Sequence, residues 1–270
     1  MPRVSVNGIE LYYEERGEGV PVLGIHGTPS SALLWENAAA ELAAISRCIT
    51  YDRRGFYRSG RPEPFDAVDL TDHVDDAAAL LEILHAAPAV VIGRSTGGEI
   101  ALYLAHRFPE LVKALVLLEP AVFWMDPDAL AWAMELRKSV LDAAARDPRT
   151  AAERVLRTVL GDQAWDALPG TLKDMFAATS PAVLAEIRGE GLDLSEEQPE
   201  LDAEALAELR HPTLILSAED SPEPLHRVTA RLADALPHSE SVTVDGGHLI
   251  YPAHPAVLEF VRRVAAEADT

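Results

Sequence analysis

The chain has 270 residues, of which 48% are hydrophobic and 25% are charged, and this composition is typical of a folded globular protein. Acidic side chains outnumber basic ones by 44 to 23, which gives a formal net charge of −21. A protein this acidic is not expected to bind nucleic acid or an anionic membrane.

A single cysteine, Cys48, falls in a predicted strand, so no disulfide can form within the chain and a reducing compartment is expected. No uncharged stretch is long enough to cross a membrane, and the N-terminal residues lack the apolar centre of a signal peptide. Together these features predict a cytoplasmic protein.

The first part of the chain predicts a hairpin followed by alternating strands and helices. Asn7-Gly8 separates the strands predicted at 3–6 and 9–15 and is a strong hairpin signal. The patterns that follow predict strands at 20–25, 48–51, 89–92 and 114–118, and helices at 31–42, 70–85 and 99–108. Such alternation favours a mostly parallel sheet that helices cover on both faces.

The pattern changes at Pro120. From 121 to 210 it is helical, with helices predicted at 130–145, 150–160, 163–177 and 181–188. Alternation then resumes, with strands predicted at 212–217 and 241–244 and helices at 225–236 and 255–266. We therefore predict an α/β core formed by residues 1–120 and 211–270, into which residues 121–210 are inserted as an all-α cap.

The sequence Gly93-Arg94-Ser95-Thr96-Gly97 stands between a predicted buried strand and a predicted helix. This is the pattern of a nucleophile elbow, a sharp turn that exposes a serine hydroxyl above a sheet. Glycines fit two residues before and after the serine because side chains there would collide with neighbouring backbone. The free N–H groups of the helix that follows would point at the reaction centre.

Two further motifs accompany the elbow, namely His26-Gly27-Thr28-Pro29 and Asp52-Arg53-Arg54-Gly55 with Ser59. With these motifs the chain resembles α/β-hydrolase-fold proteins of the serine-nucleophile branch that carry a helical cap. The resemblance covers the core from end to end and implies an eight-stranded, mostly parallel sheet with flanking helices. It does not imply one substrate, because this fold hosts many chemistries.

The resemblance also implies a catalytic triad in the order serine, acid, histidine. Ser95 would be the nucleophile, which needs a base within hydrogen-bond reach. Among nine histidines, His248 is the candidate base, because it follows the last predicted strand through the pair Gly246-Gly247.

Two carboxylates compete for the role of the acid. Asp220 follows the strand predicted at 212–217 and precedes His248 by 28 residues, although Ser217 stands where the family usually has glycine. Glu119, at the end of the preceding core strand, occupies an alternative acid position known in some branches. We favour Asp220, and we expect Glu119 to pair with Arg94, since a buried arginine needs a carboxylate.

The resemblance assigns the oxyanion hole to the backbone N–H groups of Thr28 and Thr96. It gives His26 a supporting role in the oxyanion loop rather than that of a base. Arg53, Arg54 and Arg58 are interpreted as parts of a structural loop. The sequence has no metal-ligand spacing and no dinucleotide fingerprint, so neither a metal nor another cofactor is predicted.

The predicted cap contains many aromatic and methionine side chains, and we expect Trp124 and Trp132 to reach the substrate. An apolar pocket favours an uncharged or hydrophobic small-molecule substrate. We therefore predict a serine hydrolase of carboxylic esters or lactones that works through an acyl-enzyme. Hydrolysis of thioesters or of C–C bonds and perhydrolysis would use the same groups, and a non-hydrolytic ligand-binding or cyclisation protein is the alternative outside this class. Epoxide hydrolases and dehalogenases are disfavoured, because they have aspartate where Ser95 stands. The oligomeric state is left open.

Overall fold

An eight-stranded sheet runs through the computed structural model, which describes residues 2–197 and 201–266. The ranges predicted for the core and the cap also contain residues 1, 198–200 and 267–270, which lie outside the described residues. The strands follow one another across the sheet in the order β1-β2-β4-β3-β5-β6-β7-β8. Their bounds are β1 (Arg3–Val6), β2 (Ile9–Arg16), β3 (Pro21–Ile25), β4 (Arg47–Tyr51), β5 (Ala89–Arg94), β6 (Val112–Leu118), β7 (Thr213–Ala218) and β8 (Ser239–Val244).

Only the first strands of the sheet are antiparallel: β1 pairs with β2, and β2 pairs with β4. The pairs from β4 through β3, β5, β6 and β7 to β8 are all parallel. Every residue of β5 is buried, as expected of a strand in a parallel sheet that is covered on both faces. The predicted mostly parallel eight-stranded α/β sheet is thus confirmed.

Helices cover the two faces of this sheet, and alternate strand residues belong to two separate apolar clusters. Val91 and Leu117 pack on the face covered by α2 (Leu70–Ile83), α3 (Thr96–Arg107) and α10 (Glu223–Ala235). Val90 and Val116 pack on the other face, under α1 (Glu36–Leu42) and α11 (Pro255–Ala266). The short helices η1 (Ala32–Trp35) and η2 (Pro109–Leu111) lie in the connections. Cys48, in β4, is a buried free thiol.

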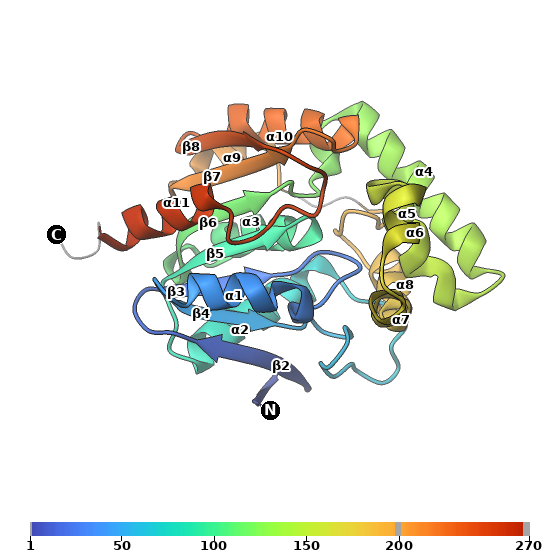
Figure 1. Ribbon diagram of the computed structural model, residues 1–270, viewed down its shortest axis with the longest axis horizontal. Coiled ribbons are helices and arrows are strands. Elements are labelled where there is room, and N and C mark those ends of the chain that lie inside the picture. The colour runs from blue at the N-terminus through green and yellow to red at the C-terminus, as the bar shows by residue number, and fades with distance from the viewer. Residues whose placement is uncertain (1, 198–200, 267–270) are drawn as a thin grey trace.

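Between β6 and β7 the described residues form helices and no strand. These are η3 (Phe123–Met125), α4 (Pro127–Ala144), η4 (Pro148–Thr150), α5 (Ala151–Leu160), α6 (Asp162–Ala167), α7 (Gly170–Ala178), α8 (Ser180–Arg188) and α9 (Ala203–Glu208). We call α4 to α8 the cap helices, and Figure 1 shows them gathered at one end of the sheet. None of the described helices is both long and apolar enough to cross a bilayer.

The structure divides the helix predicted at 163–177 into α6 and α7. Leu168 leaves the helical conformation with φ −64° and ψ 142°, because the ring of the following proline disfavours a helical backbone at the preceding residue. Helix α9, which the sequence pattern did not predict, has the side chain of Asp202 as its N-cap, accepting a hydrogen bond from the Ala205 N–H.

Candidate active site

Ser95 follows β5 directly and has a left-handed backbone, with φ 53° and ψ −124°. A non-glycine residue pays in strain for this conformation, so it must be held by its neighbours. The Ser95 N–H donates to the Leu118 carbonyl at 3.0 Å, and the Ser95 carbonyl accepts from the Ala121 N–H at 3.1 Å. Both contacts come from the end of β6 and the residues after it, so the neighbouring strand holds the turn.

The two glycines of the motif have no room for a side chain. A Cβ on Gly93 would lie 2.2 Å from the Gly97 carbonyl oxygen, and a Cβ on Gly97 would lie 2.3 Å from the Ile25 carbonyl oxygen. Both distances are far below van der Waals contact. The local geometry of a nucleophile elbow, predicted from the sequence, is therefore present.

His248 lies in the loop after β8 and is only 6% exposed. Its Nδ1 is 2.7 Å from Oε2 of Glu119. Because an ionised carboxylate can only accept a hydrogen bond, Nδ1 bears the proton and Nε2 is left as the acceptor. No hydrogen bond joins Ser95 to His248 among the described residues, and catalytic hydrogen bonds are often long before substrate binds.

Glu119 follows β6 and is fully buried, also with a left-handed backbone (φ 45°). Its carboxylate accepts hydrogen bonds from the Ala218 N–H at 2.8 Å and the Ser221 hydroxyl at 2.7 Å, in addition to the one from His248. Burial alone would raise the pKa of Glu119, but the hydrogen bond from His248 and the two other donors lower it below its usual value. The carboxylate is therefore ionised at neutral pH.

The structure contradicts the assignment of Asp220 as the acid that orients His248. Asp220 is exposed in a turn after β7, and its backbone N–H is bonded to the Gly246 carbonyl at 2.9 Å. The turn leaves the Asp220 side chain in solvent and directs the Ser221 hydroxyl to Glu119 instead. Glu119 thus occupies the position next to the histidine that the sequence analysis gave to Asp220.

The expected pairing of Glu119 with Arg94 is also wrong. Arg94 is buried, and the hydrogen bond described for its side chain is a long one, 3.5 Å from Nη2 to the Ser30 hydroxyl. None of the ion pairs between described residues includes Arg94. Burial without a carboxylate lowers the pKa of this arginine to about 10.

The loop after β3 is held by His26, as the resemblance implied. The Arg53 N–H donates to His26 Nε2 at 2.9 Å, and His26 Nδ1 lies 2.8 Å from the Gly27 carbonyl. This pattern requires the neutral imidazole with its proton on Nδ1. Burial and the charge of Arg53 hold the pKa of His26 well below its usual value, so His26 acts as a support and not as a base.

The arginine loop after β4 is structural, as interpreted from the sequence. Arg54 binds both carboxylate oxygens of Asp76, at 2.8 and 2.7 Å. Arg58 Nε donates to the buried Asp52 at 2.6 Å. These arginines have carboxylate partners within the protein and are not free to bind an anion.

Four of the predicted site residues, namely Thr28, Ser95, Trp132 and His248, line one small cavity. It is lined by Thr28, Ser95, Asp193, His248 and seven apolar residues: Phe123, Trp132, Leu136, Val155, Val159, Leu194 and Leu225. The centre of a water molecule can occupy only about 20 Å³ of it, which is room for about one water. Trp132 thus lies where the sequence analysis expected it, whereas Trp124 is not part of the lining and its neighbour Phe123 is.

Thr28 lines this cavity with Ser95, whereas Thr96, the next residue in the chain, is fully buried and is not part of the lining. Thr96 is the first residue of α3, where a backbone N–H has no partner within the helix. The Thr28 hydroxyl donates to Oε2 of Glu186, at 2.7 Å, and it also accepts from Arg53. The use of these two N–H groups as an oxyanion hole stays a prediction.

The sequence analysis missed two buried carboxylates from the cap region, Glu186 and Asp193. Glu186, on α8, bonds Arg53 at 2.5 Å and His73 at 2.8 Å. It stands in the run Ala182-Val183-Leu184-Ala185-Glu186-Ile187, and a charge inside an apolar run is a signal that could have identified it. Asp193 lies on the segment after α8, where no such pattern points to it.

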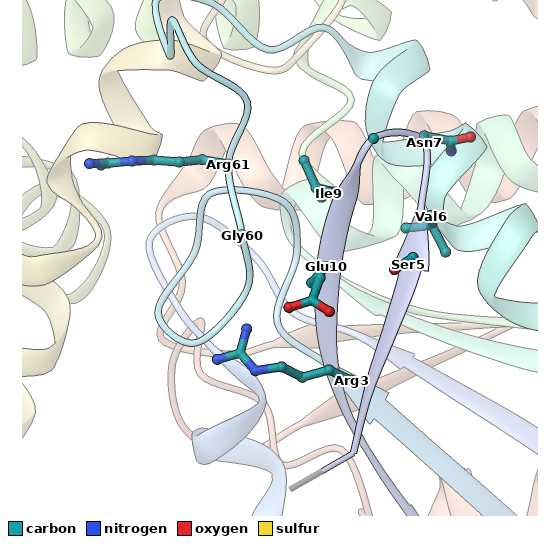
Figure 2. A pocket seen from close by; sticks show the side chains of 9 residues that line it. Arg3, Ser5, Val6, Asn7, Ile9, Glu10, Gly60 and Arg61 are labelled. Atoms are coloured by element: carbon teal, nitrogen blue, oxygen red, sulfur yellow. The ribbon is translucent and has the colours of Figure 1, made fainter.

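A second hollow lies between the β1–β2 hairpin and Gly60 and Arg61 of the loop after β4 (Figure 2). Figure 2 shows Arg3 and Glu10 on one side of the hairpin and Arg61 pointing away from them. No histidine or cysteine lines it. Within the described part of the chain, no group of three or more metal-binding side chains is present.

Comparison with known proteins agrees with this architecture. The family model described as "alpha/beta hydrolase fold" matches residues 20–255. The "Uncharacterized hydrolase YraK" of Bacillus subtilis is 36% identical over 117 residues, which are 43% of each chain. The "Putative non-heme bromoperoxidase BpoC" of Mycobacterium tuberculosis is 31% identical over 96% of this chain and 100% of its own.

Among solved structures, that of "Est816 as an N-Acyl homoserine lactone degrading enzyme" has the same fold. It superposes with a TM-score of 0.72 at 24% identity, over 98% of this chain and 99% of its own. At this level of sequence identity, the similarity shows only that the two chains share a fold.

Proposed function

Because the chain belongs to the α/β-hydrolase family, we propose that it is a serine hydrolase that cleaves carboxylic esters or lactones of uncharged small molecules through an acyl-enzyme. One observation carries the proposal. A buried histidine bonded to an ionised glutamate lines the same small cavity as a serine on a strained turn.

In the proposed reaction the Ser95 hydroxyl attacks the carbonyl carbon of the substrate. His248 takes the hydroxyl proton at Nε2, while the Nδ1 proton stays bonded to Glu119. The buried carboxylate stabilises the imidazolium that forms. The N–H groups of Thr28 and Thr96 stabilise the oxyanion, and each such donor typically contributes about 3 kcal/mol to the transition state.

The second half of the reaction releases the acid. His248 returns the proton to the leaving alcohol, and a water molecule then attacks the acyl-enzyme with His248 as its base. For a lactone the alcohol and the acid remain parts of one product. The predominance of apolar residues in the cavity lining supports an uncharged or hydrophobic acyl group. Est816, which shares the fold, is described as a lactone-degrading enzyme, and lactones are therefore a substrate class to test here.

A second candidate activity is perhydrolysis, which the similarity to BpoC favours. Hydrogen peroxide would replace water in the attack on the acyl-enzyme, so that the acyl group leaves as a peroxyacid and Ser95 regains its proton. The same residues would serve both reactions, and the choice between them depends on which nucleophile reaches the acyl-enzyme.

The test is covalent labelling together with hydrolysis. A fluorophosphonate should label Ser95 in the wild-type protein, and p-nitrophenyl esters of short fatty acids should be hydrolysed. Ser95→Ala should abolish labelling and lower kcat by at least about a thousandfold with an unchanged melting temperature. Labelling of another residue, or normal turnover by Ser95→Ala, would contradict the proposal. Peroxyacid formation from acetate and hydrogen peroxide would identify the perhydrolase activity.

A further inference from the structure

The cavity next to Ser95 contains a carboxyl group that the proposed reaction does not use. Asp193 lines the cavity and is 8% exposed. Its Oδ2 accepts a hydrogen bond from the hydroxyl of Thr96, at 3.0 Å, and Thr96 is the residue after Ser95. No lysine or arginine is part of the lining.

The position of Asp193 is fixed through its backbone as well. Its N–H donates to Oε2 of Glu99 at 3.0 Å. Glu99 is fully buried on α3, the helix that begins directly after Ser95. The segment after α8 is thus tied to the nucleophile's own helix at two points, so the carboxyl group of Asp193 is held beside the reacting serine.

The charged and titratable groups around Asp193 come from several elements. Glu99 faces it from α3, Glu186 from α8, Arg53 from the loop after β4, and His248 shares the cavity. Burial raises the pKa of Asp193 to about 7, the charge of Glu186 acts in the same direction, and the Thr96 hydroxyl and Arg53 oppose the shift. Burial also raises the pKa of Glu99 well above its usual value.

We propose that Asp193 determines substrate specificity: it restricts the cavity to esters with an uncharged acyl chain and rejects esters whose acyl chain ends in a carboxylate. This inference rests on the proposed hydrolase function. Two negative charges a few ångströms apart in a buried site repel each other strongly. No lysine or arginine lines the cavity, and Arg53 is already paired with Glu186.

The discrimination against anionic esters should change with pH in one direction. Below pH 7 Asp193 is mostly protonated and uncharged, so the repulsion is weak. Well above pH 7 it is mostly ionised, and the repulsion is then strong. Discrimination against an anionic ester should therefore increase as the pH rises through about 7. A purely structural Asp193 would affect neutral and anionic esters alike.

The experiment compares p-nitrophenyl butyrate with the mono-p-nitrophenyl ester of glutaric acid, whose free carboxylate stays ionised between pH 5.5 and 8.5. The ratio of their kcat/KM values is measured across this range, so that any pH effect common to both esters cancels. In the wild-type protein we expect the preference for butyrate to rise about tenfold or more with pH. In Asp193→Asn the ratio should be smaller and independent of pH.

Asp174→Asn is the matched control, because it removes the same charge from α7, away from the cavity lining. It should retain the wild-type ratio at every pH. A wild-type ratio that does not change with pH would overturn the inference without any variant. The inference would also be overturned if Asp193→Asn had the same ratio of kcat/KM values for the two esters as the wild type. These results leave the proposed function intact when Ser95 is labelled and the butyrate ester is hydrolysed; a wild-type protein that does neither contradicts both.

Discussion

At the scale of single residues, the sequence predicted the sharp turn at Ser95 and the place of His248 beside the same cavity, but not the carboxylate that bonds this histidine. Ser95 stands in a motif that needs its two glycines, because a Cβ at either would lie 2.2 or 2.3 Å from a backbone oxygen, and such a requirement is visible in the sequence. The choice between Glu119 and Asp220 depends on which side chain the turn after β7 directs inward. The turn directs the Ser221 hydroxyl to Glu119 and leaves Asp220 exposed, and no pattern of residue types predicts this.

The first prediction at this scale separates the two carboxylates. Glu119→Gln should lower kcat by about a thousandfold to ten-thousandfold at neutral pH, because an amide cannot stabilise the imidazolium or fix its tautomer as the carboxylate does. Asp220→Asn is the matched control and should keep near wild-type turnover, since its side chain is in solvent. Active-site titration followed by steady-state kinetics on both variants measures this.

Glu119 is buried and receives hydrogen bonds from the Ala218 N–H and the Ser221 hydroxyl, so replacing it also affects the stability of the fold. Thermal melts must therefore accompany that comparison. The kcat of each variant is therefore calculated per active site counted by titration, so that unfolded molecules are not included. An inactive Asp220→Asn beside an active Glu119→Gln would show that His248 changes its partner during the reaction, and it would reject Glu119 as the acid.

At the scale of elements, the cap helices are joined to the core by a charged contact at the start of α4. Asp126 is the N-cap of α4 and accepts from the N–H groups of Asp128 and Ala129. The same carboxylate binds Arg227 on α10 through both oxygens, at 2.9 and 3.2 Å. Trp132 and Leu136 of α4 line the cavity, so this contact also positions part of the cavity wall.

We predict that Arg227→Ala loosens α4 and opens the cavity. Since the cavity holds about one water molecule, a bulky reagent can reach Ser95 only after the cap helices or their side chains move. The variant should be labelled several-fold faster than the wild type by a bulky fluorophosphonate, with little change for a small one, and it should melt at a lower temperature. Stopped labelling reactions measured by mass spectrometry provide the rates.

Arg231→Ala is the control for this effect. Arg231 approaches the same carboxylate only to 3.6 Å, and its side chain is 60% exposed against 39% for Arg227. It should behave like the wild type in both assays. Equal rates for the bulky reagent in Arg227→Ala and Arg231→Ala would mean that this contact does not control access.

The cap also shows what a helical pattern can and cannot predict. Periodicity placed most of the helices of this region within a few residues, because apolar spacing reflects the face that each helix buries. It did not foresee the break at Leu168, although Pro169 was visible in the sequence. The expectation for Trp124 was also wrong, because Trp124 packs against the apolar core while Phe123 lines the cavity. Which of two adjacent aromatic residues faces the substrate depends on the rotation of a short helix.

At the scale of the whole molecule, alternating strands and helices were sufficient to predict the sheet, because buried parallel strands require continuous apolar runs.

The net charge of −21 affects the stability of the folded chain. A chain with so many excess negative charges repels itself in the compact state, and salt shortens the range of that repulsion to about 8–10 Å at moderate ionic strength.

We therefore predict that moderate salt stabilises this protein more at pH 8 than at pH 5. Raising sodium chloride from about 20 to about 300 mM should raise the melting temperature by a few degrees at pH 8, because it screens the repulsion. At pH 5, close to the sequence pI of about 4.7, the net charge is small and the increase should nearly vanish. Differential scanning calorimetry at both pH values tests this. Equal salt effects at the two pH values would show that net repulsion does not limit stability.

The contact between Glu119 and His248 also affects how related sequences should be sorted into active and inactive proteins. A pattern that demands aspartate at the position of Asp220 would accept a relative that has glutamine in place of Glu119, and it would discard one that keeps Glu119 and lacks Asp220. The bonds of Glu119 to His248 and Ser221 argue for the opposite selection. A pattern built on Ser95, Glu119 and His248 would choose better candidates for assay from a genome.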